Sequence, residues 1–126
     1  MRAELNFPGL EVRRFEERGI QVVALSGELD LASVGQMESA LDVARADERP
    51  RVCLDLAELQ FIDSTGLATV IRTHLGIEEA GGALAVVCSE GAVRRTVQTT
   101  GLLEMLTVTD SRAAAIDALP GSAPDA

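Results

Sequence analysis

The stretch Phe61-Ile62-Asp63-Ser64-Thr65-Gly66-Leu67 lies where a predicted strand gives way to a predicted helix. The apolar run 52–56 before it is typical of a buried strand. After it, apolar residues recur at helical spacing and lie along one face: Leu67, Val70, Ile71, His74 and Leu75. A hydroxyl at this junction is exposed near free backbone N–H groups and the positive end of a helix dipole, which favours a phosphate. The alternative is that Asp63, Ser64 and Thr65 are helix N-caps, for which these residue types are preferred.

The length and composition predict one cytoplasmic domain with an aliphatic core. The chain has 126 residues, enough for a single core, and 47% of them are hydrophobic but only 2% aromatic. No apolar run approaches the roughly 18 residues that a membrane helix needs. Residues 1–6 also lack the apolar segment of a signal peptide.

The charged residues and the cysteines exclude several classes of function. A net charge of −9 argues against nucleic acid and anionic membranes as partners. Every Lys or Arg position is an arginine, so mechanisms that need a lysine, such as a P-loop or a Schiff base, are excluded. Cys53 and Cys88 fall in apolar runs and are predicted to be buried, unpaired thiols, although a redox role stays open.

The pattern of elements predicts an α/β fold. The elements expected, in order, are strands 10–15 and 20–25, a helix from Ser33 that ends before Pro50, strand 52–57, helix 64–80, strand 84–88, a helix through Val93 and Val97 that stops at Gly101, strand 106–108 and helix 113–119. The first two strands are joined tightly and should form an antiparallel hairpin. The later alternation of strand and helix implies parallel strands. We therefore expect a mixed sheet of four or five strands in one domain, 1–119, followed by a flexible tail, 120–126.

Local signals add detail to this plan. Residues 27–30 are predicted to form a loop. Ser33 with Gln36 has the form of a capping box, and Val34, Met37, Leu41 and Ala44 share one face of the helix that it opens. Ser89 and Asp110 are the caps expected for the last two helices.

No catalytic or metal site emerges from these residues, so an enzyme, a cofactor and a metal are not expected. The only histidine, His74, lies ten residues beyond Ser64, about 15 Å along one helix, and cannot act as its base. It is predicted to be a half-buried packing residue. One His and two distant Cys do not match a zinc site, and no glycine fingerprint of a dinucleotide site is present. Asp55 is predicted to face away from Val52, Leu54 and Leu56 on its strand. A phosphorylated receiver domain would need a late lysine, which the chain lacks.

Four motifs along the chain resemble those of bacterial anti-sigma factor antagonists, which are single-domain proteins of the STAS group. They are 27–30 (Gly-Glu-Leu-Asp), 61–67, 81–82 (Gly-Gly) and 100–102 (Thr-Gly-Leu). The resemblance covers nearly the whole chain, apart from the two tails. One departure is Ala68, where many members have a second glycine.

This resemblance implies a STAS-like fold and a partner-switching protein rather than an enzyme. Such proteins, when unphosphorylated, bind an anti-sigma factor that is also a serine kinase of the histidine-kinase-like ATPase fold. Binding frees the sigma factor, phosphorylation ends the binding, and a serine phosphatase restores it. By position, Ser64 matches the phosphorylated serine, with Thr65 as the second choice. Asp63 would orient the loop or cap the helix, and Asp30 matches a position used in docking the kinase.

The expected partner surface surrounds this serine. Thr65, Ala68, Thr69 and Arg72 are predicted to share a stripe turned away from Leu67, Ile71 and Leu75; an ordinary solvated face is the alternative. The full set of expected partner-binding residues is Asp30, Ser33, Asp63, Ser64, Thr65, Gly66, Ala68, Thr69 and Arg72.

The second hypothesis is a STAS subunit of a larger signalling or transporter assembly that does not switch. A small hydrolase acting through Ser64 is the third.

Overall fold

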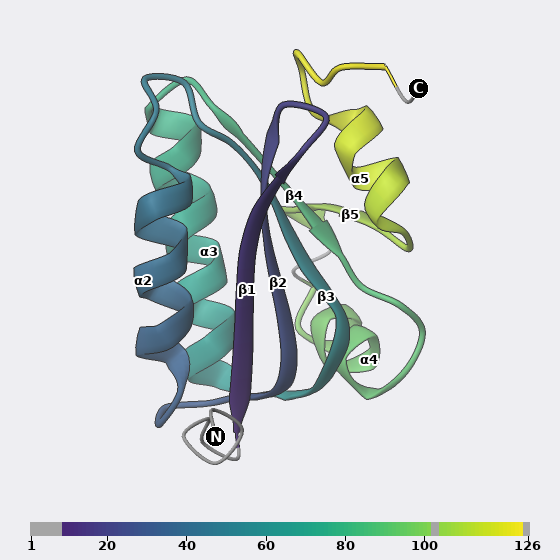
Figure 1. Ribbon diagram of the computed structural model, residues 1–126. Helices are drawn as coiled ribbons and strands as arrows, with labels where there is room; N and C mark the ends of the chain where they lie inside the picture. Colours follow the sequence, from purple (N-terminus) through teal and green to yellow (C-terminus); the bar gives the residue numbers. More distant parts are fainter. Residues whose placement is uncertain (1–8, 102–103, 125–126) are drawn as a thin grey trace, which may run out of the picture.

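A computed structural model describes residues 9–101 and 104–124 (Figure 1). One mixed five-stranded sheet has the strand order β1-β2-β3-β4-β5. The strands are β1 Leu10–Glu17, β2 Ile20–Leu29, β3 Arg51–Ile62, β4 Ala83–Val87 and β5 Thr107–Thr109. The helices are α2 Val34–Ala44, α3 Ser64–Glu79, α4 Ala92–Thr99 and α5 Arg112–Ala118. The predicted α/β fold with a mixed sheet is confirmed.

The chain opens with the predicted antiparallel hairpin. Strands β1 and β2 pair from Leu10↔Gly27 to Glu17↔Ile20. The two turn residues, Arg18 and Gly19, have φ values of 53° and 79°. Positive φ at both central residues matches the right-handed twist of the flanking strands. The other strand pairs, from β2–β3 to β4–β5, are parallel.

Helices cover both faces of the sheet. Figure 1 shows α2 and α3 side by side on one face and α5 on the other. The larger core contains the predicted α2 face and lies between the sheet and helices α2, α3 and α4; its members include Met37, Leu41, Leu54, Leu67, Val70, Val93 and Val97. The smaller core packs Ala115, Ile116 and Leu119 against the opposite face of β2, β3 and β4.

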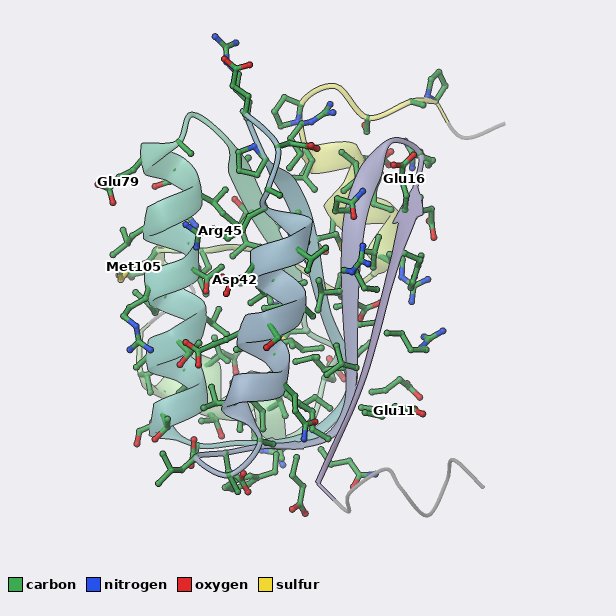
Figure 2. The ribbon with its side chains drawn as sticks, turned by 60° about the vertical axis from the view of Figure 1, so that its left-hand side comes forward. Glu11, Glu16, Asp42, Arg45, Glu79 and Met105 are labelled. Carbon is green, nitrogen blue, oxygen red and sulfur yellow. The ribbon has the colours of Figure 1, made fainter. Side chains whose placement is uncertain are left out.

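Arg45, which follows α2, extends across to α3. Figure 2 shows its side chain pointing toward that helix. A Cβ at Gly76 would lie 2.7 Å from Arg45 Nη2, so a larger residue there would require this flexible side chain to move.

Strand β3 is longer than the predicted 52–57 because it contains two β-bulges. Its pairing with β2 shifts between Ala24↔Asp55 and Ser26↔Glu58, and again between Gly27↔Leu59 and Glu28↔Phe61. Each shift adds one residue to β3, which breaks the alternation that marks an ordinary strand. Strand β2 likewise continues through 27–29, so the loop predicted for 27–30 was wrong for these three residues and begins at Asp30.

The predicted helix caps also need correction. Ser33 makes no side-chain hydrogen bond to α2, so there is no capping box. Helix α4 follows Gly91 rather than Ser89 and has no side-chain cap. Helix α5 is capped by Ser111 rather than Asp110, since the Ser111 hydroxyl accepts from Ala114 N–H at 3.1 Å.

Several predictions about single residues are confirmed. Cys53 and Cys88 are buried and unpaired. Burial, helped by the charge of Asp55, raises the pKa of Cys53 to about 12, and burial likewise raises the pKa of Cys88. Asp55 does face away from Leu54 and Leu56, which belong to the larger core. His74 is fully buried rather than half-buried. Within the described residues, no helix is long and apolar enough to cross a bilayer.

Candidate functional site

The site lies where two parallel strands end together. Leu29 and Ile62, the last residues of β2 and β3, are paired, so the segments that follow them are neighbours. The backbone N–H of Asp63 donates to the carbonyl of Leu29 at 3.1 Å. The loop from 30 to 33 and the start of α3 therefore form one surface at the carboxyl edge of the sheet.

Asp63 is the N-cap of α3, as the resemblance implied. Its Oδ1 accepts from Gly66 N–H at 2.9 Å, and its Oδ2 accepts from Leu31 N–H at 3.3 Å. One oxygen thus caps the helix and the other holds the neighbouring loop. Of the two roles considered for Asp63, it performs both.

Ser64 is the first residue of α3 and is exposed. Among the described residues, its hydroxyl has no hydrogen-bond partner, and the capping position is already filled by Asp63. The capping alternative is therefore confirmed for Asp63 and wrong for Ser64. A free hydroxyl at the positive end of a helix of 16 residues is well placed to carry a phosphate.

Gly66 brings this end of α3 close to the sheet. A Cβ at this position would lie 2.9 Å from Ile62 Cγ1 and 3.0 Å from Leu29 Cγ. Gly66 is buried, so it allows α3 to pack closely on the sheet but cannot contact a partner directly.

Asp30 and Ser33 form a tight turn beside Asp63. Asp30 Oδ1 accepts from the N–H groups of Ala32 and Ser33 at 3.0 and 3.1 Å. The Ser33 hydroxyl accepts from Asp30 N–H at 3.0 Å and donates to the Glu28 carbonyl at 2.9 Å. Ser33 is buried and holds the turn, whereas Asp30 is half-buried.

The predicted stripe on α3 was partly wrong. Ala68 and Arg72 are exposed, but Thr69 is buried and its hydroxyl donates to the Thr65 carbonyl at 2.9 Å. Leu75, which was expected to face inward, is 46% exposed. The exposed stripe of α3 therefore runs through Ser64, Ala68, Arg72 and Leu75, with Ile71 and Thr65 half-buried at its margins.

Two apolar side chains at the site were missed. Leu31 is 74% exposed and Phe61 is 48% exposed, although both are large hydrophobic residues. Leu31 is held beside Asp63 by its N–H, and Phe61 lies two residues before Asp63 on β3. Exposure at these positions follows from the turn at Asp30 and the second bulge, neither of which the sequence pattern had indicated.

The described residues contain no group of three or more His, Cys, Asp or Glu side chains that could hold a metal ion. The carboxylates of Asp30 and Asp63 instead accept hydrogen bonds from main-chain N–H groups of the loop and the helix.

Comparison with known proteins identifies the family. The family model described as the STAS domain matches residues 13–115. The chain belongs to the STAS domain family.

Relatives of this STAS chain include named regulators. It is 30% identical over 111 residues to an anti-sigma F factor antagonist of Paenibacillus polymyxa, which covers 87% of this chain and 95% of that protein. It is 28% identical over 89 residues to the anti-sigma-F factor antagonist RsfB of Mycobacterium tuberculosis, covering 69% and 70% of the two chains. The resemblance read from the four motifs is thus confirmed, although Leu102 of the last motif lies outside the described residues.

Solved structures agree with this assignment. The crystal structure of an anti-sigma factor antagonist from Mycobacterium paratuberculosis superimposes with a TM-score of 0.80 at 26% identity, covering 89% of this chain and 95% of that one. SpoIIAA in its unphosphorylated form has a TM-score of 0.68 at 24% identity, covering 85% and 94%, and supports the fold alone.

Proposed function

We propose that this protein is an anti-sigma factor antagonist that works as a partner switch. Unphosphorylated, it binds an anti-sigma factor that is also a serine kinase of the histidine-kinase-like ATPase fold, and so frees a sigma factor. Phosphorylation of Ser64 ends the binding, and a serine phosphatase restores it. The protein acts in the cytoplasm, without catalysis of its own. The relatives named as anti-sigma factor antagonists support this proposal.

The observation that carries the switch is the free hydroxyl of Ser64 on a helix that another residue caps. Asp63 already accepts from Gly66 N–H, so phosphorylation removes no hydrogen bond that holds the fold. The phosphate adds about 1.5 to 2 negative charges beside the positive helix end, which on the free protein gains about 0.3–1 kcal/mol. The free fold therefore tolerates the modified residue.

The same phosphate disrupts a closed interface. Exposed residues at this edge of the sheet, among them Leu31, Phe61 and Ala68, are small or apolar. A partner packed on these side chains would bury the phosphate as an unpaired charge, which costs on the order of 3–5 kcal/mol. Such a cost corresponds to roughly a thousandfold loss of affinity. In this proposal Asp30 and Arg72 supply the charged contacts at the edge of the interface.

The proposal is tested by capture of the partner from a lysate of the source cell with ADP present. Wild type, Ser64→Asp and the matched control Ser39→Asp, which adds the same charge at an exposed serine of α2, are used as baits, and bound proteins are identified by mass spectrometry. We expect wild type and Ser39→Asp to capture an ATPase of the histidine-kinase-like fold, and Ser64→Asp to capture less than about a hundredth as much. With ATP in place of ADP, the captured kinase should modify wild type on Ser64.

Each other outcome has a defined meaning. Modification of Thr65 in place of Ser64 would move the acceptor by one residue. Equal capture of the same partner by wild type and Ser64→Asp would reject the switch and favour a constitutive STAS subunit of a larger assembly. Turnover of an activated ester that disappears in Ser64→Ala would reject the non-enzymatic assignment.

A further inference from the structure

The position of Ser64, which follows the end of β3, depends on the first β-bulge of this strand. Strand β3 pairs with β4 only as far as Asp55↔Val87 and then continues beside β2 alone. The bulge follows directly, between Asp55 and Glu58. A bulge leaves a backbone N–H without a ladder partner and bends the strand. Asp55 is therefore the last residue of β3 before its course changes.

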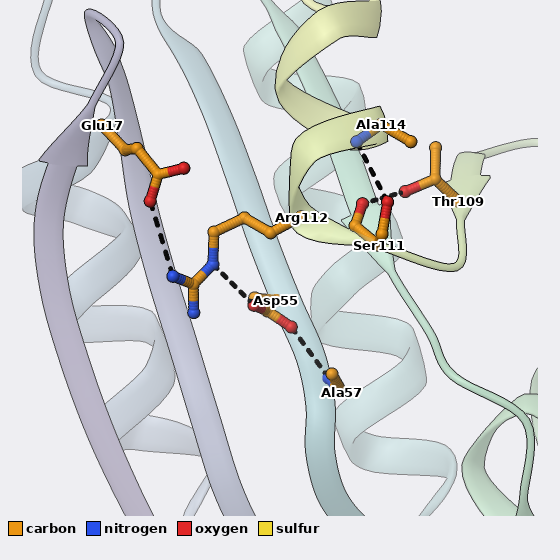
Figure 3. Close-up of polar contacts among 7 residues, drawn as sticks. All are labelled: Glu17, Asp55, Ala57, Thr109, Ser111, Arg112 and Ala114. Carbon is orange, nitrogen blue, oxygen red and sulfur yellow. Dashed lines mark hydrogen bonds and ion pairs between the residues drawn. The ribbon is translucent and has the colours of Figure 1, made fainter. Parts of the chain in front are cut away.

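The carboxylate of Asp55 supplies the missing partner. Its Oδ1 accepts from the N–H of Ala57, inside the bulge, at 2.9 Å. Figure 3 shows this bond together with a second one, in which Arg112 Nε donates to Asp55 Oδ2 at 2.9 Å. The Asp55 side chain is only 8% exposed, so both oxygens are held by protein groups.

Arg112 fixes that carboxylate from the start of α5. Its Nη1 lies 3.5 Å from Glu17 Oε1, and its guanidinium lies over the Phe15 ring, 5.0 Å from the ring centre. Partial burial lowers the pKa of Arg112, but hydrogen bonds and charges from Asp55 and Glu17 outweigh it and raise the pKa above its ordinary value. The guanidinium of Arg112 thus contacts both β1, through Glu17 and Phe15, and β3, through Asp55.

The bulge sets which side chains beyond it face the core. The core positions of β3 are Val52, Leu54, Leu56, Leu59 and Ile62, so the spacing changes from two residues to three after Leu56. A shift of register by one residue moves a strand's whole apolar set to the opposite face. Without the bulge, Leu59 and Ile62 would leave the core, and Asp63 would no longer meet Leu31.

We propose that Asp55 is a positioning residue for Ser64: its carboxylate holds the bulge at Ala57, and the bulge aims the end of β3 that carries Asp63 and Ser64. Arg112 keeps the carboxylate in place. The inference concerns the geometry of the Ser64 loop and does not depend on whether Ser64 is phosphorylated.

The test is amide hydrogen exchange on the isotopically labelled full chain, read at Leu31 and Gly66. Both N–H groups donate to Asp63, so their exchange reports whether Asp63 is in place. Each rate is divided by that of Val23, a core strand amide, so that a general loss of stability cancels. Asp55→Ala should raise both ratios about tenfold, whereas Asp55→Asn, which keeps an oxygen acceptor, should raise them by less than about twofold.

The control is Asp117→Ala, which breaks the other ion pair of α5, at 2.6 Å to Arg18, without touching the bulge. It should leave both ratios unchanged. Unchanged ratios in Asp55→Ala, or an equal rise in Asp117→Ala, would overturn the proposal. If Asp55→Ala does not fold, the double variant Asp55→Ala/Arg112→Gln removes both charges of the Asp55–Arg112 pair, leaves only the 39% exposed Glu17 side chain without this partner, and must show the same tenfold rise.

Discussion

The carboxylate of Asp63 lies 2.9 Å from the N–H of Gly66 and closes the first turn of α3. Replacing Asp63 by Ala removes this cap and should lower the free energy of unfolding by about 1 kcal/mol. Asp63→Asn keeps an acceptor oxygen and should lower the free energy of unfolding by only a few tenths of a kcal/mol. Urea denaturation of both variants measures the difference. An equal loss in both would show that the charge, rather than the acceptor, stabilises the helix.

Gly66 is predicted to tolerate no side chain. Because a Cβ would lie within 3.0 Å of Ile62 and Leu29, Gly66→Ala should lower the free energy of unfolding by about 1–3 kcal/mol. The matched control is Gly35→Ala in α2, where a Cβ meets nothing within 4 Å. That variant should gain up to about 1 kcal/mol. Thermal unfolding of the pair checks the prediction, which fails if both variants shift in the same direction.

His74 should be replaceable by an apolar residue. Its Nδ1 is buried and has no hydrogen-bond partner among residues 9–101 and 104–124, while its Nε2 lies 3.4 Å from the exposed Glu78 carboxylate. Because an unpaired buried polar atom costs stability, His74→Leu should raise the free energy of unfolding by about 1 kcal/mol. Glu78→Gln, as control, should change it by less than about 0.5 kcal/mol. A loss in His74→Leu with no loss in the control would show that the imidazole ring packs better than leucine.

Stability should fall at alkaline pH because of Cys53. Its pKa is raised from 9.0 to about 12 in the fold, so above pH 9 the unfolded chain loses a proton that the folded chain keeps. The free energy of unfolding therefore declines between pH 9 and 12, by up to about 4 kcal/mol. The chain has no lysine or tyrosine to titrate in this range, but burial also raises the pKa of Cys88, so the two thiols have to be separated by mutation. Denaturation at a series of pH values measures the decline, and Cys53→Ala should make it shallower, while the part that remains should disappear when Cys88→Ala is added. A decline of the same steepness in Cys53→Ala would contradict the assignment.

The order of elements was predictable because each has its own periodicity and stop signal. Helix α3 followed from the spacing of Leu67, Val70 and His74 and from Gly81-Gly82, and the hairpin from the glycine at its turn. These signals are local in the sequence, so contacts with distant parts of the chain do not change what they predict. The same junction was compatible with a phosphate, but the choice of Ser64 as the acceptor came from the resemblance to anti-sigma factor antagonists.

What the sequence did not reveal depends on contacts across the chain. Thr69 and Leu75 lie at the edges of the α3 face, where the neighbours of the helix decide which one is buried. Ser33 serves the Asp30 turn instead of its own helix because the Glu28 carbonyl lies within reach. The bulges of β3 left one trace, the change in apolar spacing after Leu56, which a strict alternation rule takes as the end of a strand.

The arrangement of the chain at the two ends of the sheet has a practical consequence. Ser64 lies at the carboxyl edge of the parallel strands, whereas segment 119–124 lies at the opposite edge, as Figure 1 shows. There Ala123 N–H donates to the Arg18 carbonyl, Arg18 Nε donates back to Ala123, and Arg51 donates to Pro120. A fluorophore, an affinity tag or a second domain attached beyond this segment would leave the Ser64 surface open. Protein immobilised on a sensor chip through this segment would keep the Ser64 surface facing the solution.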